Sequence, residues 1–342
     1  MTGDVSAARE TEALRLLTYN VKHLALDRDG VVTVLGDADA DVVAVQEPPR
    51  GIFRYRLHQV ARAAGLRVAL RGRGARTTAF LVRADLAASG SLRARSLPDS
   101  FPSAQASDRV LPGATAPTGP SAPVGPNALA AAPRPSRPPD VVRTRRVRLP
   151  FRGPRSRRAR PILRGVAILE LHGLTIVNVH LSLDTAERAR HVEIVRRLVD
   201  SGPFDDGAGP GRVVLVGDLN ETPTDVSWRT LRTVLDDAFD RARSGAGDPR
   251  PGQASGRGSE PVGTVKDVSP ERTGDLDPVD AGAQPLTFPA HEPRLRLDGI
   301  LVGHEVEVHE VAVVDTRAAR RASDHLPVLA VLATRSAPWR TP

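Results

Sequence analysis

The 342-residue sequence contains no cysteine, only two lysines, and few aromatic residues, which make up 3% of the chain. The absence of cysteine excludes disulfides, thiolate-bound zinc, iron–sulfur clusters and thiol nucleophiles. No run of 18 apolar residues occurs, so we expect no transmembrane helix. Residues 1–12 are polar and acidic and lack the basic-then-apolar order of a secretory signal. We therefore expect a soluble cytoplasmic protein.

Arginine supplies nearly all of the positive charge. The chain has 48 Lys+Arg residues and 40 Asp+Glu residues, which gives a formal net charge of +8. This excess favours an anionic partner such as nucleic acid, a phosphorylated metabolite or a lipid headgroup. The arginine content is accompanied by abundant Ala and Gly, a bias that is also typical of GC-rich genomes, so it discriminates weakly among these partners.

Short apolar segments of strand length recur along the chain, and each ends in polar residues. Four of them cover residues 14–19, 41–46, 174–179 and 212–217. Their β-branched character predicts strands buried on both faces. Residues 57–65, 185–199 and 227–239 are predicted helices between these strands. The fold class is therefore α/β, with sheets covered by helices.

Two stretches lack the large apolar residues of a core. Residues 101–140 hold 10 prolines, and residues 241–284 are rich in Gly, Pro and Asp. We interpret both as long insertions within one domain over residues 14–335, preceded by a flexible N-terminus (1–13) and followed by a tail (336–342). A division into two domains at the first stretch is less favoured, because polar strand ends occur on both sides of it.

Polar side chains at or just after the apolar runs can gather at one edge of a sheet, as they do in α/β proteins. They are Asn20, Glu47, His180, Asp218, Asn220, Asp324 and His325. Carboxylate and amide oxygens without thiolates suit Mg²⁺ or Mn²⁺ better than zinc. Each position alone also has a structural explanation, such as a turn or a packed core histidine. Their combination in one chain favours a functional site.

Six short motifs occur in an order that resembles the endonuclease/exonuclease/phosphatase superfamily. They are TYNV (18–21), VQE (45–47), NVHL (178–181), GDLN (217–220), LDGIL (297–301) and SDHLPV (323–328). The superfamily includes DNase I-like nucleases, AP endonucleases, inositol-polyphosphate 5-phosphatases and neutral sphingomyelinases. TFP (287–289) resembles its bacterial metal-dependent hydrolase branch. The resemblance implies a four-layer α/β sandwich, in which two packed mixed β-sheets are flanked by helices and the site lies at one edge.

The resemblance also implies a metal site. Glu47 and Asn20 would hold the divalent ion, Mg²⁺ or Mn²⁺, and Asp324 would support the metal or the phosphate contacts.

The remaining motif positions would carry the chemistry. Asp218 and Asn220 would position the attacking water or the phosphate. His325, oriented by Asp298, would act as general base or as the electrostatic partner of the scissile phosphate. His180 would contact the phosphate. A carboxylate behind an imidazole fixes its orientation, which is consistent with these roles.

The implied function is that of a divalent-metal-dependent phosphoesterase that hydrolyses phosphodiester bonds, a nuclease acting on DNA or RNA as a monomer. Two alternatives stay open. One is a phosphatase or phosphodiesterase acting on a small-molecule or lipid phosphate, and the other is a non-catalytic nucleic-acid-binding protein on the same fold. The Tyr-x-Pro-Asn-Gly stretch expected of dedicated AP endonucleases is absent.

Two further features have no settled role at this level. Gly299 stands where an aromatic residue often follows the aspartate, which either opens the pocket or has no effect. Residues 143–164 contain 10 arginines and no acidic residue. They form either a solvated basic loop or a phosphate-tracking surface beside the site. Residues 71–76 are also unusually basic.

Overall fold

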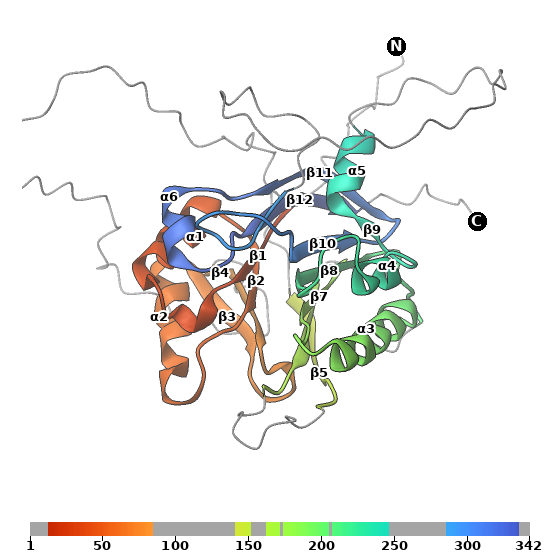
Figure 1. Ribbon diagram of the computed structural model, residues 1–342, viewed down its shortest axis with the longest axis horizontal. Coiled ribbons are helices and arrows are strands. Elements are labelled where there is room, and N and C mark those ends of the chain that lie inside the picture. Colours follow the sequence, from red (N-terminus) through yellow and green to blue (C-terminus); the bar gives the residue numbers. More distant parts are fainter. Residues whose placement is uncertain are drawn as a thin grey trace, which may run out of the picture.

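Two six-stranded mixed sheets pack against each other at the centre of the molecule (Figure 1). The computed structural model describes residues 13–84, 141–151, 162–171, 174–204, 207–245 and 285–334. The first sheet has the strand order β11-β12-β1-β2-β4-β3, and the second has the order β5-β6-β7-β8-β10-β9.

The first sheet consists of β1 (Leu14–Asn20), β2 (Val42–Gln46), β3 (Leu66–Arg71), β4 (Thr78–Arg83), β11 (Val306–Val313) and β12 (Val328–Thr334). The second consists of β5 (Val141–Arg148), β6 (Gly165–Leu171), β7 (Leu174–His180), β8 (Val213–Asp218), β9 (Asp236–Asp237) and β10 (Asp298–Val302). Each sheet has one parallel pair near its middle, β1 with β2 and β7 with β8. The expected strands are therefore confirmed.

Helices cover the outer face of each sheet and complete the four layers. In Figure 1, α1 (Arg28–Ala38), α2 (Tyr55–Ala63) and α6 (Arg317–Ala322) lie on the left, over the first sheet. On the right, α3 (Thr185–Asp200) and α4 (Val226–Leu231) cover the second sheet. The remaining helix, α5 (Ala238–Gly245), packs beside β10 and β11. Short 3₁₀ turns are η1 (Lys22–Leu24), η2 (Gly51–Arg54) and η3 (Arg73–Ala75).

The alternation of side chains along each strand explains why both faces are buried. In β1, Leu16 points into the core between the sheets, and the next residue, Leu17, packs under the helices. Successive strand residues point to opposite faces, so a strand covered on both sides must be apolar throughout. The polar residues are left for the strand ends, where the site is built.

Helix α3 shows how local sequence sets an element's bounds. The Asp184 side chain accepts a hydrogen bond from the Glu187 amide and caps the first turn. Val192, Val195 and Val199 then form the apolar stripe that packs on the second sheet. The predicted helices over residues 185–199 and 57–65 are confirmed within two residues at each end.

The single helix expected over residues 227–239 is wrong. The chain forms α4, a turn, the two-residue strand β9, and then α5. The interruption follows from Asp237, which pairs with β10 and binds a buried arginine from its strand position. The expected insertion over residues 241–284 is also wrong at its start, because α5 continues to Gly245.

The remaining predictions of chain organisation fall outside the described residues. These are the insertion at 101–140, the rest of the second insertion, the N-terminal segment before Ala13, and the tail. Ala13 itself is buried. None of the helices in the described part of the chain has the length and apolar character needed to cross a membrane.

A buried arginine fastens β9 and α4 to the second sheet. The guanidinium of Arg296 donates two hydrogen bonds to the Asp237 carboxylate, at 2.8 and 2.7 Å. It also lies over the rings of Trp228 and Phe239, 4.7 and 4.5 Å from their centroids. Both charges are almost fully buried, so each depends on the other for compensation.

We expect Asp237→Ala to destabilise the fold by roughly 3–5 kcal/mol, because it leaves a buried guanidinium unpaired. Urea denaturation followed by circular dichroism measures this loss. Glu292→Ala is the control, since it removes an exposed partner of Arg294 and should change stability little. Equal losses in the two variants would contradict the account.

Candidate active site

Strand pairing places polar residues of each sheet in one row at a common edge. In the second sheet, Asp218 at the end of β8 is the register partner of both His180 and Asp298. In the first sheet, Asn20 at the end of β1 pairs with Gln46, and Glu47 follows directly. Neighbouring strands lie about 4.8 Å apart, so residues distant in sequence become close neighbours.

A buried amide pair joins the two rows. The side chain of Gln46 donates to the side-chain oxygen of Asn178 at 2.8 Å. Asn178 in turn donates to the main-chain oxygens of Val45 and Ala79. Gln46 precedes Glu47, and Asn178 lies two residues before His180, so this pair sets how the two rows face each other.

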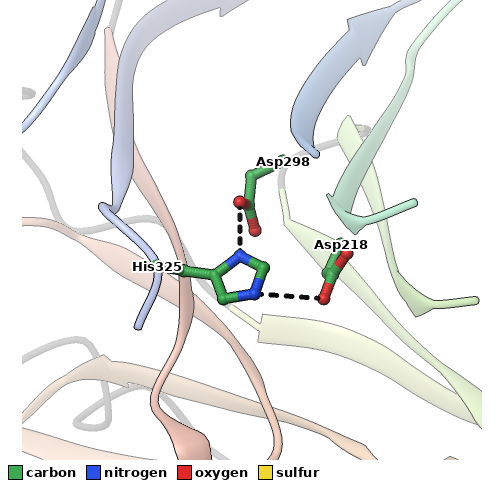
Figure 2. Close-up of side chains that lie close together, drawn as sticks. All are labelled: Asp218, Asp298 and His325. Atoms are coloured by element: carbon green, nitrogen blue, oxygen red, sulfur yellow. Dashed lines mark hydrogen bonds and ion pairs between the residues drawn. The ribbon is translucent and has the colours of Figure 1, made fainter. Parts of the chain in front are cut away.

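Asp218 is at the centre of the site. Its carboxylate accepts a hydrogen bond from the Asn20 side-chain amide at 3.0 Å. The same oxygen lies 3.5 Å from Nε2 of His180 and 3.8 Å from Nε2 of His325. Figure 2 shows the His325 ring lying between the carboxylates of Asp218 and Asp298, which come from different elements.

The second nitrogen of His325 is held by Asp298. Nδ1 lies 2.8 Å from an Asp298 carboxylate oxygen, and both residues are buried. The 287–289 motif supports this pair. The Thr287 hydroxyl oxygen accepts from the Asp298 amide at 3.3 Å, and the Phe288 ring lies 4.9 Å from that of His325. The imidazole is therefore held by the Asp298 carboxylate at one nitrogen and packs against the Phe288 ring.

The surrounding charges favour a protonated His325. Burial alone disfavours the imidazolium, but the carboxylates of Asp298, Asp218 and Asp324 outweigh it and raise the pKa of His325 to about 10. The ring is therefore largely protonated at neutral pH, whereas a general base requires the neutral form. This favours the electrostatic role over the general-base role.

The pKa of His180 is lowered, whereas the pKa of Asp218 is raised. Burial, together with the charges of Arg164 and His325, lowers the pKa of His180 well below its ordinary value, so its ring is neutral at pH 7. Burial raises the pKa of Asp218 to about 6, against the opposing effect of the His325 charge. Asp218 is thus a carboxylate whose proton affinity lies close to neutral pH.

Glu47 faces this centre from the first sheet. Its backbone has a positive φ of 51°, which is uncommon for a residue with a side chain and turns the chain sharply at the end of β2. One carboxylate oxygen lies 3.7 Å from Nε2 of His180, the nitrogen that also approaches Asp218. The other lies 3.4 Å from His23.

This donor set fits a hard divalent cation. Glu47, Asp218 and Asn20 offer carboxylate and amide oxygens, the ligands that Mg²⁺ and Mn²⁺ prefer. Within the described ranges, no Lys or Arg lies at ion-pair distance from either carboxylate. The two converging negative charges are compensated by the His325 imidazolium and, at longer range, by the guanidinium of Arg164.

The last two expected site residues make other contacts. Asn220 has a positive φ of 51°; its amide N–H donates to Asp218 and its side chain donates to the Leu181 carbonyl. Asp324 forms an ion pair with Lys22 at 2.6 Å and lies beside the site rather than at its centre. Because Asp324 is paired with Lys22, its expected role as a support of the metal remains a prediction.

Sequence reasoning did not single out Arg164 or the Gln46–Asn178 pair. Arg164 is 5% exposed and donates to the main-chain oxygen of His180 at 3.3 Å. Among the residues described, no carboxylate lies within ion-pair distance of its guanidinium. In the sequence, the feature that could have indicated Arg164 is its position directly before the apolar run of β6. The other described arginines of this segment, including Arg143 and Arg146, belong to or flank the edge strand β5. The rest lie outside the described residues.

Gly299 does not open the pocket. A Cβ on this residue would lie 2.4 Å from the Trp228 ring. The indole therefore occupies the space that an aromatic residue at position 299 would take, and the glycine is required by that packing.

Comparison with known proteins identifies the family. The model of the "Endonuclease/Exonuclease/phosphatase family" matches residues 17–325. The chain belongs to the endonuclease/exonuclease/phosphatase family. Members of this family are phosphoesterase hydrolases that typically use divalent metals. A search of curated protein sequences finds no match.

Solved structures of the family share the fold at low sequence identity. A Bacteroides thetaiotaomicron family protein is 15% identical, with a TM-score of 0.55, covering 94% of this chain and 95% of that one. The mannosyl-6-phosphatase of the same organism is 14% identical, with a TM-score of 0.52 and coverages of 94% and 99%. Humanized D. rerio TDP2 is 13% identical, with a TM-score of 0.51 and the same coverages. These likenesses confirm the DNase I-like α/β sandwich.

We expect Asp298→Asn to lower the pKa of His325, because it removes the carboxylate that most strongly favours the imidazolium. NMR titration of the imidazole in metal-free protein measures this directly. The wild-type ring should titrate near pH 10 and the variant ring closer to the ordinary value of about 6.5. Identical titration in both proteins would contradict the assigned pairing.

Proposed function

We propose that this family member is a divalent-metal-dependent phosphoesterase that hydrolyses phosphodiester bonds in nucleic acid. The observation that supports this most is the convergence of Glu47, Asp218 and His325 at one edge, from both sheets. A phosphodiester repels its nucleophile, so hydrolysis requires neutralised charge and a positioned water. Glu47, Asp218 and His325 together offer groups that could neutralise charge and position the water.

Glu47 and Asn20 would hold the metal ion. When bound, the ion supplies Lewis-acid chemistry, neutralising the phosphate charge and polarising its oxygens. Asp218, which already contacts Asn20, would border the ion and the substrate.

Asp218 would also orient the attacking water and accept its proton. A pKa of about 6 leaves this carboxylate mostly ionised at neutral pH and still basic enough to take a proton. The Asn220 amide N–H holds one Asp218 oxygen at 2.9 Å, and the other oxygen faces His180 and His325. Asn220 thus keeps the base in place for the water.

The two histidines would bind the phosphate in different charge states. Protonated His325 would place its Nε2–H and its positive charge beside the developing negative charge. Neutral His180 would contribute a hydrogen bond without charge. Buried Arg164 would add a second fixed positive charge behind His180. Asp298 and Asp324 would act through His325, as its orienting partner and as a source of negative potential.

Nucleic acid is the proposed substrate because of the charge of the chain. The net charge of +8 is carried almost entirely by arginine, which binds phosphate through two parallel N–H groups. Hydrolysis of a sugar phosphate is the second candidate, and likeness to a mannosyl-6-phosphatase favours including it in the tests.

We expect Glu47→Gln and His325→Ala each to lower hydrolysis at least about a hundredfold, the lower end of what a proton-transfer or charge-stabilising group supplies. Nicking of supercoiled plasmid with Mg²⁺, abolished by EDTA, is the primary assay. Glu193→Gln and His309→Ala are matched controls away from the site and should retain full activity. Near-normal turnover in both site variants would remove the assignment.

A substrate panel distinguishes the alternatives. Cleavage of a phosphomonoester without DNA cleavage would support the small-molecule phosphatase. Salt-sensitive DNA binding with no hydrolysis of any ester would support the non-catalytic binder. Either outcome would replace the nuclease assignment.

A further inference from the structure

A cavity lined by arginines begins directly beside the proposed metal site. It has a volume of about 290 Å³, and its lining includes Pro48, Arg50, Arg54, Arg71 and Arg76. Arg50 follows Glu47 by three residues, so the two Cα atoms are at most about 11 Å apart. The lining also includes Leu163, the chain neighbour of the buried Arg164. The cavity therefore adjoins the site through the residues next to Glu47 and Arg164 in the chain.

A second hollow continues from the first along the surface. It has a volume of about 700 Å³ and shares Arg54, Arg71 and Gly72 with the first cavity. Its far side reaches Arg146 on β5. We call the two hollows together the arginine trough. It runs from the loop after Glu47 towards β3 and β5, the edge strands of the two sheets.

Among the described residues, the cations of the trough form no ion pairs with carboxylates, although the charge of Glu47 acts on Arg50. Across the described residues, no carboxylate lies within ion-pair distance of Arg50, Arg54, Arg71, Arg76 or Arg146. Many arginines elsewhere are paired, as Arg188 is with Glu221 and Arg241 is with Asp236. Like charges gathered without counter-charges repel each other and favour an external anion.

Main-chain contacts hold several of these guanidinium groups in place. Arg146 donates through Nε to the Arg71 carbonyl at 3.3 Å. Arg71 donates through Nη1 to the Arg54 carbonyl at 2.6 Å. Each contact uses one of the five donors of a guanidinium, so the other donors remain available for a ligand.

The backbone around the trough is fixed as well. Arg76 has a φ of +55°, a conformation that side chains rarely adopt. The preceding η3 turn packs so tightly on β6 that a Cβ on Gly165 would lie 1.7 Å from the Gly74 carbonyl oxygen. Strain and close packing at this point are consistent with a site arranged before its ligand arrives.

We propose that the arginine trough binds phosphate groups of the nucleic-acid strand next to the scissile phosphate. This inference rests on the proposed function. Phosphate matches the fork of N–H donors on arginine, and two linked hollows suit a ligand with repeated phosphates. A strand with its scissile phosphate at the metal site has further phosphates on either side, and the trough would hold those on one side.

The shifted ionisation of Arg71 agrees with this assignment. Burial and the charge of Arg54 both lower its pKa. The nearby His58 also has a lowered pKa, through burial and the charge of Arg71. The other charged groups that line the trough are the arginines already named, so a bound anion would relieve repulsion among all of them.

The test compares Arg54→Gln/Arg71→Gln with a matched control, Arg190→Gln/Arg197→Gln, which removes two exposed arginines of α3. Both are made in the active chain and in the His325→Ala background. Fluorescence anisotropy in the inactive background measures binding of a labelled eight-nucleotide single strand at several salt concentrations. In the active background, kcat/KM is measured for the same strand and for bis-p-nitrophenyl phosphate, an ester with one phosphate.

We expect the trough variant to bind the strand about tenfold more weakly, the equivalent of one charge-assisted hydrogen bond. The slope of log K against log salt should fall by about 0.7 for each phosphate that the variant no longer binds. The variant should lose about tenfold more kcat/KM on the strand than on the one-phosphate ester. Arg54→Lys/Arg71→Lys should recover part of the binding, since it keeps the charge without the fork. The α3 control should match the unmodified protein in each measurement.

An unchanged salt slope in the trough variant, or an equal loss on both substrates, would overturn the proposal. Loss of tripolyphosphate binding with unaltered strand binding would also overturn it, in favour of a small polyphosphate. If the unmodified protein cleaves no ester, the proposed function fails, and the anisotropy data still decide whether the trough binds the strand. Thermal unfolding of each variant establishes that it is folded.

Discussion

The hydrogen bond between Gln46 and Asn178 is the contact on which the arrangement of the site depends. It lies in the core between the sheets, one residue from Glu47 and two residues from His180. Two sheets packed only through apolar side chains could slide or rotate with little loss, because apolar contact has no direction. A buried amide pair has direction, and leaving either partner unsatisfied is costly. This bond therefore relates Glu47, the proposed metal ligand on the first sheet, to the proposed phosphate contacts on the second.

Electrostatics at the common edge follows from that placement. Carboxylates from both sheets converge where burial disfavours charge, and the compensation comes from one protonated imidazole and one buried guanidinium. The same groups give Asp218 and His325 opposite protonation preferences. A pair of groups held apart in this way can serve as base and cation at one pH. The Phe288 ring packs against His325, 4.9 Å from its ring.

Much of this could be predicted from residue patterns, and some could not. Strands buried on both faces were recognisable because β1 and β8 are apolar without a break. Most candidate site residues could be picked out because they follow apolar runs, and Asp298 was indicated only by the resemblance of its motif to the superfamily. The break at Asp237 was missed, since its buried partner Arg296 lies 59 residues away and no local pattern records the pairing. The charge state of His325 was equally hidden, because it depends on three carboxylates brought together only by folding.

The role of the arginines also could not be predicted from the sequence alone. The number of arginines indicated an anionic partner. It did not show where that partner would bind or which arginines form ion pairs within the protein. The fold makes that separation, because Arg143 faces Glu170 while Arg146 reaches towards Arg71 on the other sheet. A basic composition thus became a defined trough only when the edge strands of both sheets lay together.

The central claim of the proposed function is that one divalent ion is held by Glu47 and Asn20 of the first sheet and is bordered by Asp218 of the second. Calorimetric titration with Mn²⁺ of the unmodified protein, Glu47→Gln and Asp218→Asn tests it most directly, because each variant alters one sheet. The account predicts that Glu47→Gln weakens Mn²⁺ binding strongly, because it removes a charged ligand, and that Asp218→Asn weakens it less, because it removes only a neighbouring negative charge. Unchanged Mn²⁺ affinity in Glu47→Gln, or a larger loss in Asp218→Asn than in Glu47→Gln, would contradict this account.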